Sequence, residues 1–167
     1  MRLKDKVSII TGAGRGIGQA TAVKFAREGA KIVVSDVSAD AIAETVQLCE
    51  SEGAQTLGVV ADVTDKKSLQ KMVDATLAKF GRIDCLVNNA GIVADAQMKN
   101  MTDEQFDKVI AVNLKGVFLG CQIFGKYLVE RGEGGSIINL GSMSGIVPLS
   151  RVFTYSATKA AVHNLSK

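Results

Sequence analysis

The chain has 167 residues, of which 47% are hydrophobic and 22% are charged, and its formal net charge at pH 7 is +3. This balance is typical of a folded globular protein and excludes a disordered or fibrous chain. Lysine and arginine are scattered along the sequence, so no basic stripe indicates binding to nucleic acid. Because a chain of this length buries about 70% of its unfolded surface, we expect residues 1–167 to form a single domain.

The three cysteines, Cys49, Cys85 and Cys121, lie far apart and have neither CxxC nor metal-ligand spacing. An odd number of cysteines argues against a disulfide framework. No apolar run reaches the ~20 residues of a membrane span, and the N-terminal apolar run is too short for a signal peptide. We therefore expect reduced thiols, no metal site, no membrane partner and a cytoplasmic location.

The start of the chain predicts a strand, a tight glycine turn and a helix. An apolar run at 7–10 ends at the stretch 11–18, and helical spacing then continues to about Glu28, just before Gly29. Glycines let backbone approach a ligand, and a helix N-terminus favours a bound diphosphate. The stretch is a candidate nucleotide cradle, and an ordinary glycine-rich turn is the alternative. The residues assigned to the cradle are Gly12, Arg15, Gly16, Ile17 and Gly18.

The remaining chain alternates strands and helices. Apolar, β-branched runs predict strands at 31–35, 56–61, 83–87 and 136–140. Apolar residues at helical spacing predict helices at 39–52, 65–80 and 102–130, and a last helix from about Val152. This alternation predicts an α/β fold of the doubly wound Rossmann type, with a parallel sheet of order 3-2-1-4-5 and helices on both faces.

Asp36 closes the second predicted strand, eighteen positions after Gly18. In a doubly wound fold ligands bind at the carboxyl ends of the strands, where such a carboxylate can accept both ribose hydroxyls of an adenosine. It would repel a 2′-phosphate, which favours NAD(H), whereas Arg15 could meet that phosphate and keeps NADP(H) open. The alternative for Asp36 is a solvated acid at a strand end.

Tyr155 and Lys159 are four positions apart and therefore share one face of the last helix. A neighbouring ammonium makes a tyrosine hydroxyl easier to ionise, so Tyr155 is a candidate general acid or base. Ser142, in the loop after the fifth strand, can hold a carbonyl oxygen. Each observation has a simpler alternative, because YxxxK spacing also arises by chance and a serine in a Gly/Ser loop is often only part of a turn.

Asn113 is a polar residue within an apolar helical stretch, and Gly116 follows it. Glycine in a helix lowers its stability by about 1 kcal/mol, so we predict a local kink with a solvated carbonyl. The alternative is a core asparagine whose side chain is satisfied by backbone.

Taken together, these residues resemble the short-chain dehydrogenase/reductase family. The glycine stretch matches the family's TGxxxGxG, residues 88–91 match its NNAG, and the matches keep the family's order and spacing across the whole chain. The positions that match its catalytic tetrad are Asn113, Ser142, Tyr155 and Lys159.

The resemblance implies a role for each of these residues. Tyr155 would be the general acid or base, and Lys159 would assist its ionisation and hold the nicotinamide ribose. Ser142 would orient the substrate, and Asn113 would support a water-linked proton relay through Lys159. Further cofactor contacts are implied for Asp62, Val63, Asn89, Ala90 and Gly91. His163 matches no catalytic position, and we expect it to be a bystander.

Within the family, the stretches at 91–95, 101–106 and 113–118 are similar to those of 3-oxoacyl-thioester reductases. The resemblance implies an NAD(P)(H)-dependent oxidoreductase that acts on a ketone or secondary alcohol, such as a 3-oxoacyl thioester. Asp36 departs from the NADP preference common in that subgroup. NAD-linked polyol, sugar-acid and secondary-alcohol dehydrogenases are therefore alternatives.

Members of the family usually continue through further strands and a loop that covers the substrate. We therefore expect an unpaired edge on the fifth strand, association into a homo-oligomer (dimer or tetramer) or aggregation, and weak or no turnover. An alternative of another class is a truncated nucleotide-binding fragment or interaction module without turnover.

Overall fold

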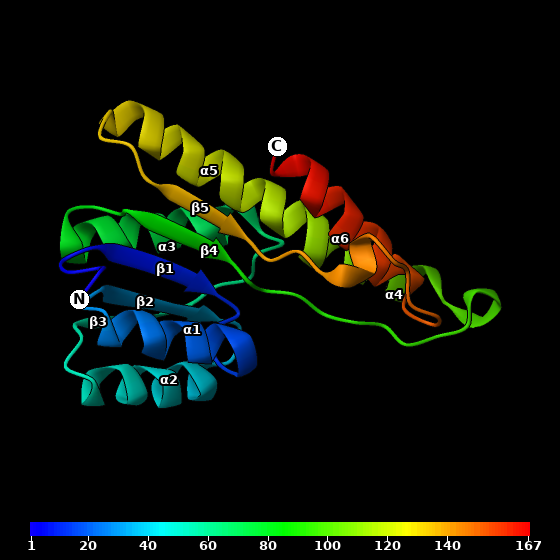
Figure 1. The fold of residues 1–167 in the computed structure, drawn as a ribbon, viewed down its shortest axis with the longest axis horizontal. Helices are drawn as coiled ribbons and strands as arrows, with labels where there is room; N and C mark the ends of the chain where they lie inside the picture. The colour runs from blue at the N-terminus through cyan, green and yellow to red at the C-terminus, as the bar shows by residue number, and fades with distance from the viewer.

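The computed structural model describes residues 1–167 and contains one five-stranded sheet of order β3-β2-β1-β4-β5 (Figure 1). Every neighbouring pair of strands is parallel. The strands are β1 Val7–Thr11, β2 Lys31–Asp36, β3 Thr56–Val60, β4 Cys85–Asn88 and β5 Ser136–Asn139. The predicted doubly wound fold and strand order are confirmed.

Six α-helices connect or follow the strands. They are α1 Gly16–Arg27, α2 Ala39–Ser51, α3 Lys66–Phe80, α4 Asp103–Ile110, α5 Gly116–Arg131 and α6 Phe153–Leu165. Their ends follow the capping residues in the sequence. Asp65 caps α3 by accepting the N–H groups of Lys67 and Ser68, and Gly81 ends the same helix in the left-handed conformation, with φ of 74°.

The central strand β1 explains why the strands read as nearly continuous apolar runs. All five of its residues are buried, because helices cover both faces of the sheet. Ile9 packs into the cluster beneath α3 and α5, while its neighbour Ile10 packs into the cluster beneath α1 and α2. Successive side chains of a strand point to opposite faces, so a doubly covered strand buries side chains on both faces and is mostly apolar.

The predicted helix at 102–130 is a continuous helical run with a π-helical turn, η2, at Ala111–Lys115, between α4 and α5. Its start at Thr102 is confirmed, since Thr102 and Gln105 form a reciprocal capping box. The local kink predicted near Asn113 and Gly116 takes the form of this π-helical turn. Gly116 is explained by packing, because a Cβ there would lie 2.8 Å from Val63 Cγ2.

The helical run Asp103–Arg131 is long and apolar enough to cross a membrane by length and composition, which the apolar runs of the sequence did not indicate. Its apolar window is 44% buried within the protein. Leu119, Ile123 and Phe124 are among its buried residues and belong to the core cluster between this helix and the sheet. Packing against the sheet therefore accounts for the apolar character of this helix.

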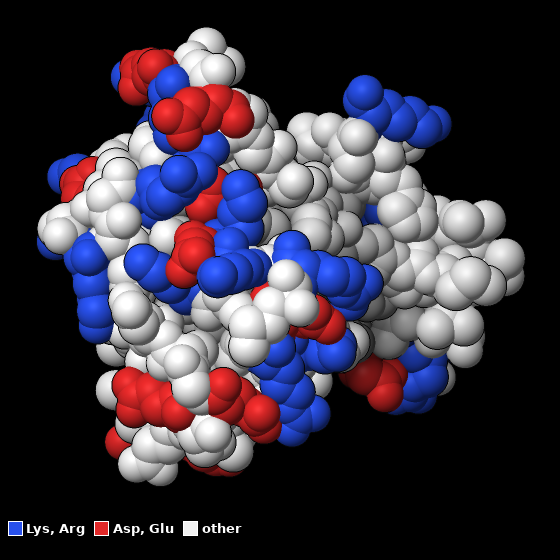
Figure 2. All heavy atoms as spheres, turned by 60° about the vertical axis from the view of Figure 1, so that its left-hand side comes forward, with Lys and Arg blue, Asp and Glu red and all other residues white.

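Helices α4 and α6 lie beyond the carboxyl ends of the strands (Figure 1). The segment that leads to α4 contains the short helix η1 Met98–Asn100, and the one that leads to α6 contains η3 Met143–Gly145. On the face shown in Figure 2, Lys and Arg alternate with Asp and Glu and do not gather into a patch of one sign. Together, α4, α6 and the segments that lead to them project to one side of the sheet (Figure 1).

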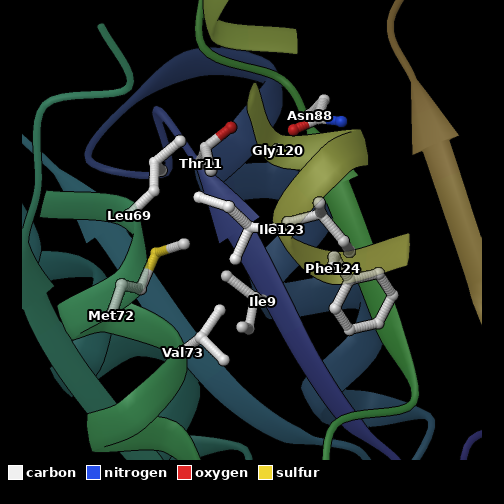
Figure 3. A pocket seen from close by; sticks show the side chains of 10 residues that line it. Ile9, Thr11, Leu69, Met72, Val73, Asn88, Gly120, Ile123 and Phe124 are labelled. Carbon is white, nitrogen blue, oxygen red and sulfur yellow. The ribbon is translucent and has the colours of Figure 1, made fainter. Parts of the chain in front are cut away.

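A small apolar void lies between the sheet and helices α3 and α5 (Figure 3). Its volume is about 10 Å³, and Ile9, Met72 and Phe124 are among its lining residues. A cavity of this size holds at most about one water molecule. The void therefore belongs to the core and is not a ligand site.

Candidate active site

The glycine turn joins the buried end of β1 to the first turn of α1. Gly12 and Gly16 have φ angles of 61° and 58°, which side chains rarely allow. A Cβ on Gly12 would lie 2.7 Å from Ala90 Cα, and one on Gly18 would overlap the carbonyl oxygen of Gly12. Arg15, the N-cap of α1, makes no side-chain capping bond, and the first turn has no acidic residue. This bare main chain at a helix N-terminus fits the diphosphate of a dinucleotide.

Thr11 and Asn89 fasten the turn to the end of β4. Thr11 Oγ1 accepts the N–H groups of Asn89 and Ala90 at 3.1 and 3.2 Å. Asn89 Nδ2 donates to the carbonyl oxygens of Thr11 and Gly12, both at 2.9 Å. The Asn89 side chain is thus occupied in holding the turn, while Gly91 is exposed at the rim. The motif spacing did not indicate these partners.

Asp36 stands at the end of β2, directly beside the turn. Its Oδ2 accepts the N–H of Gly14 at 3.0 Å, and its Oδ1 accepts those of Val37 and Ser38 at 2.8 and 3.2 Å. Arg15 and Ile17 are exposed on the turn. The structure therefore places a carboxylate and an arginine at the same rim, as the sequence predicts.

Asp62 and Val63 follow β3, and their side chains go to different places. Asp62 is exposed, and its Oδ1 accepts both the N–H and the hydroxyl of Thr64 at 2.8 Å. Val63 is buried against Gly116 of α5. Of the two side chains, only that of Asp62 lies at the surface of the rim.

Asn113 is fully buried in the π turn and clasps the backbone of Ile92. Its Oδ1 accepts the Ile92 N–H and its Nδ2 donates to the Ile92 carbonyl, both at 2.8 Å. Nδ2 also lies 3.4 Å from Thr158 Oγ1 on α6. The asparagine satisfied by backbone, one of the two alternatives from the sequence, describes this geometry. It joins the loop after β4 to the helix that carries Tyr155.

Lys159 lies buried beside Tyr155 on α6. Its Nζ is 5.6 Å from the centre of the Tyr155 ring and donates to the carbonyl oxygen of Leu140 at 2.6 Å. Only 5% of the residue is exposed, and burial lowers the pKa of the Lys159 ammonium. The predicted pair thus meets the loop after β5, although Leu140 has no chemical feature that marks it in the sequence.

Ser142 begins the loop that contains η3. Its Oγ lies 2.8 Å from Ser144 Oγ and accepts the Ser144 N–H at 3.2 Å, while its own N–H donates to His163 Nε2 at 3.3 Å. Ser144 is buried. Sequence reasoning missed Ser144 and treated His163 as a bystander, because the contact depends on how α6 lies against the loop.

The predicted residues therefore meet at one end of the sheet, where β1, β2, β4 and β5 all end (Figure 1). Hydrogen bonds connect the tetrad positions to neighbouring segments: Asn113 to the loop after β4, and Lys159 to the loop after β5. A phenol, a buried ammonium and a serine hydroxyl therefore lie at the same end of the sheet as the glycine turn. These groups can exchange a proton with a bound oxygen atom.

Comparison with known proteins supports the family resemblance seen in the sequence motifs. The family model described as short chain dehydrogenase matches residues 6–167. The 3-oxoacyl-[acyl-carrier-protein] reductase FabG of Thermotoga maritima is 41% identical over 167 residues, which cover 100% of this chain and 68% of that protein. Across the curated relatives, the chain spans between 27% and 68% of their length.

Two solved structures superpose closely on the chain. The crystal structure of levodione reductase has a TM-score of 0.94 at 40% identity and covers 98% of this chain and 64% of its own. The crystal structure of NAD⁺-bound xylitol dehydrogenase has a TM-score of 0.95 at 30% identity, with coverages of 99% and 64%. Since the family model matches nearly the whole sequence, the chain belongs to the short-chain dehydrogenase family.

Proposed function

We propose that the chain is the nucleotide-binding and catalytic part of an NAD(P)(H)-dependent oxidoreductase that interconverts a ketone and a secondary alcohol. The observation that carries the proposal is the buried Lys159 ammonium, which lies beside the Tyr155 ring and is tied to the loop that bears Ser142. Residues 1–167 would act as one domain, with the glycine turn and the tetrad sharing a single rim.

Lys159 has the donors that its proposed role requires. An ammonium carries three N–H donors, and the Leu140 carbonyl takes one of them. Two donors are left for the Tyr155 hydroxyl and a ribose hydroxyl of the cofactor. A positive charge held there favours the ionised form of Tyr155 and prepares it for proton transfer.

Tyr155 and Ser142 would handle the substrate oxygen. When bound, a nicotinamide dinucleotide supplies the hydride for reduction or accepts it in oxidation. In reduction the Tyr155 hydroxyl gives its proton to the oxygen of the carbonyl, and in oxidation the Tyr155 phenolate takes the proton from the alcohol. Ser142 donates a hydrogen bond to the same oxygen and holds it within reach of Tyr155.

Asn113 would support the replacement of that proton. Its amide is fixed by Ile92 on one side and lies within 3.4 Å of Thr158 on α6, one residue before Lys159. The π turn around Asn113 disturbs the regular helical hydrogen bonds next to the site. We propose that a water held there passes protons to Lys159 and then to Tyr155.

The proposed cofactor is NAD(H) in preference to NADP(H). Support comes from the Asp36 carboxylate, which lies beside the turn with both oxygens accepting backbone N–H groups. A carboxylate at this place accepts ribose hydroxyls and repels a 2′-phosphate. NADP(H) is the second candidate, because the exposed Arg15 offers a positive charge on the same turn.

We propose two candidate substrate classes, a ketone with apolar flanks and a polyol. The exposed side chains of Met143, Ile146, Val147 and Leu149 follow it in sequence and support a ketone with apolar flanks, such as a 3-oxoacyl thioester. The similarity to NAD⁺-bound xylitol dehydrogenase supports a polyol as the second candidate. Acetoacetyl thioesters, cyclic diketones and polyols offered in parallel distinguish these classes by their kcat/KM.

Replacement of Tyr155 by phenylalanine tests the mechanism. General acid–base catalysis contributes about 10²–10⁴-fold, so turnover should fall by that factor while NADH binding, followed by fluorescence, is unchanged. The matched control is Tyr127→Phe, because Tyr127 is the other tyrosine of the chain and its hydroxyl binds the Ile83 N–H at the far end of the sheet. Full activity in Tyr155→Phe would contradict the acid–base assignment. Cofactor binding without turnover on any substrate would select the nucleotide-binding module instead.

We also propose that the protein self-associates and works in a reducing compartment such as the cytoplasm. Phe106 on α4 and Phe118 on α5 are 43% and 46% exposed, which supports burial against another copy. The three free thiols support a reducing environment. Light scattering of the purified protein measures the state of association.

A further inference from the structure

The loop that bears Ser142 is held by α6 at two points. Lys159 Nζ donates to the carbonyl of Leu140, and one helical turn further His163 Nε2 accepts the N–H of Ser142 at 3.3 Å. Tyr155, Lys159 and His163 are spaced by four residues and therefore lie on one face of the helix. The same face thus carries the phenol and both contacts with the loop.

The imidazole fits closely against the loop backbone. A Cβ added to Gly141 would overlap His163 Nε2 and lie 2.7 Å from its Cδ2. Gly141 is not among the glycines with positive φ, so its missing side chain is a matter of space and not of backbone conformation. The glycine lets the ring approach far enough to accept the next N–H along the chain.

The chemistry of this contact requires a particular form of histidine. A backbone N–H can only donate, so Nε2 must be the ring nitrogen without a proton. The side chain of Ser142 is also fixed, because its hydroxyl forms a hydrogen bond with the hydroxyl of the buried Ser144. Backbone and side chain of Ser142 are therefore each held by a separate partner.

We propose that His163 is a positioning residue for Ser142. By anchoring the Ser142 N–H to the helix that carries Tyr155, it holds the serine and tyrosine hydroxyls in one arrangement around the substrate oxygen. The inference rests on the proposed function of Ser142 and Tyr155. It assigns a role to the one histidine of the chain.

Two substitutions of His163 separate the hydrogen bond from the volume of the ring. His163→Leu removes the acceptor, and His163→Gln keeps an oxygen at a similar reach. Loss of one positioning hydrogen bond should lower kcat about tenfold in His163→Leu, with the KM for NADH unchanged. His163→Gln should restore kcat to near the wild-type value. Wild-type kcat in His163→Leu would overturn the proposal.

Hydrogen exchange of the Ser142 amide gives a readout that needs no turnover. It should be about tenfold faster in His163→Leu than in the wild type, and slow again in His163→Gln. Equal exchange rates in all three proteins would overturn the anchor. If the wild type turns over no substrate, the proposed function fails while the exchange rates still decide whether His163 holds Ser142.

A second pair of variants covers the case in which His163→Leu does not fold. His163→Asn has an acceptor that is one carbon too short, so its kcat should be about tenfold lower and its Ser142 amide exchange about tenfold faster, whereas His163→Gln should match the wild type in both. Identical kcat and Ser142 exchange in the asparagine and glutamine variants would contradict the proposal.

Discussion

The two halves of the sheet end in loops that are held in different ways. In the first half, the glycine turn after β1 is fixed by close approach of main chain, as at Gly12 and Gly18, and by the Thr11 and Asn89 contacts. In the second half, side chains from helices reach across to loop backbone: Asn113 to Ile92, Lys159 to Leu140 and His163 to Ser142.

The strands of the two halves also differ in how far they are buried. Every residue of β1 is buried, whereas no residue of the edge strand β5 is. A strand inside the sheet is covered by neighbours and by both helix layers, and an edge strand has a neighbour on one side only. The comparison shows that the glycine turn is held by close main-chain packing together with the Thr11 and Asn89 hydrogen bonds, whereas the tetrad positions are tied to their loops by a few polar contacts from helix side chains. Substitution of those contacts should therefore damage the second half selectively.

The largest effect is expected from Asn113→Leu. The substitution leaves the N–H and carbonyl of Ile92 without their partner, and such unsatisfied groups cost about 1–3 kcal/mol each. The free energy of unfolding, measured in urea, should fall by about 3 kcal/mol. Asn164→Leu is the control, because Asn164 is exposed and should change stability by less than about 0.5 kcal/mol. Equal stability of the two variants would contradict the inference that the second half of the sheet depends on polar contacts such as that of Asn113 with Ile92.

A smaller effect is expected from Asp84→Asn at the opposite end of the sheet, where one carboxylate joins the halves. Asp84 comes just before β4, and its Oδ2 accepts the N–H of Val7 in β1 at 3.0 Å. Burial alone would raise the pKa of Asp84, but hydrogen bonds from Arg82 and Val7 and the charges of Arg82 and Lys6 lower it below its usual value. Asp84→Asn should cost about 2 kcal/mol at pH 7.

The sign of the pH dependence follows from this lowered pKa. The unfolded chain takes up the proton first as the pH falls, so the stabilisation is complete above the unfolded pKa of about 3.9 and is lost as the pH falls through the folded value. Urea titrations at pH 7 and pH 3 should therefore show a smaller difference between wild type and Asp84→Asn at pH 3. Asp74→Asn, an exposed change on α3, is the control. If the stability difference between wild type and Asp84→Asn were as large at pH 3 as at pH 7, the proposed stabilisation by the Asp84 carboxylate would be wrong.

The smallest effect is expected in the choice of cofactor. Asp36→Asn keeps an oxygen that can accept the Gly14 N–H and removes the charge, so the ratio of NADPH to NADH affinity should rise about tenfold. Fluorescence titration with both cofactors measures this ratio. Asp40→Asn removes an exposed charge at the start of α2 and should leave it unchanged. An unchanged ratio in Asp36→Asn would remove the argument for NAD(H).

Much of the fold could be predicted because its signals are local. Apolar runs, helical spacing and the capping residues Asp65 and Gly81 are written within short windows of sequence, and right-handed crossovers then leave few strand orders. The π turn at Ala111–Lys115 was not predicted as such. It gives no signal in apolar spacing and is tied to the contact of Asn113 with a segment about twenty residues earlier.

The sequence by itself determined the strand order, the place of the glycine turn and the positions that match the tetrad, because these depend on residue type and on distance along the chain. Only the tertiary structure decided what those residues touch: that Asn89 holds the turn, that Val63 packs on Gly116, and that His163 meets Ser142. Such contacts join segments far apart in sequence, and their partners are often backbone groups that every residue carries. The residue types along the sequence therefore do not predict these contacts.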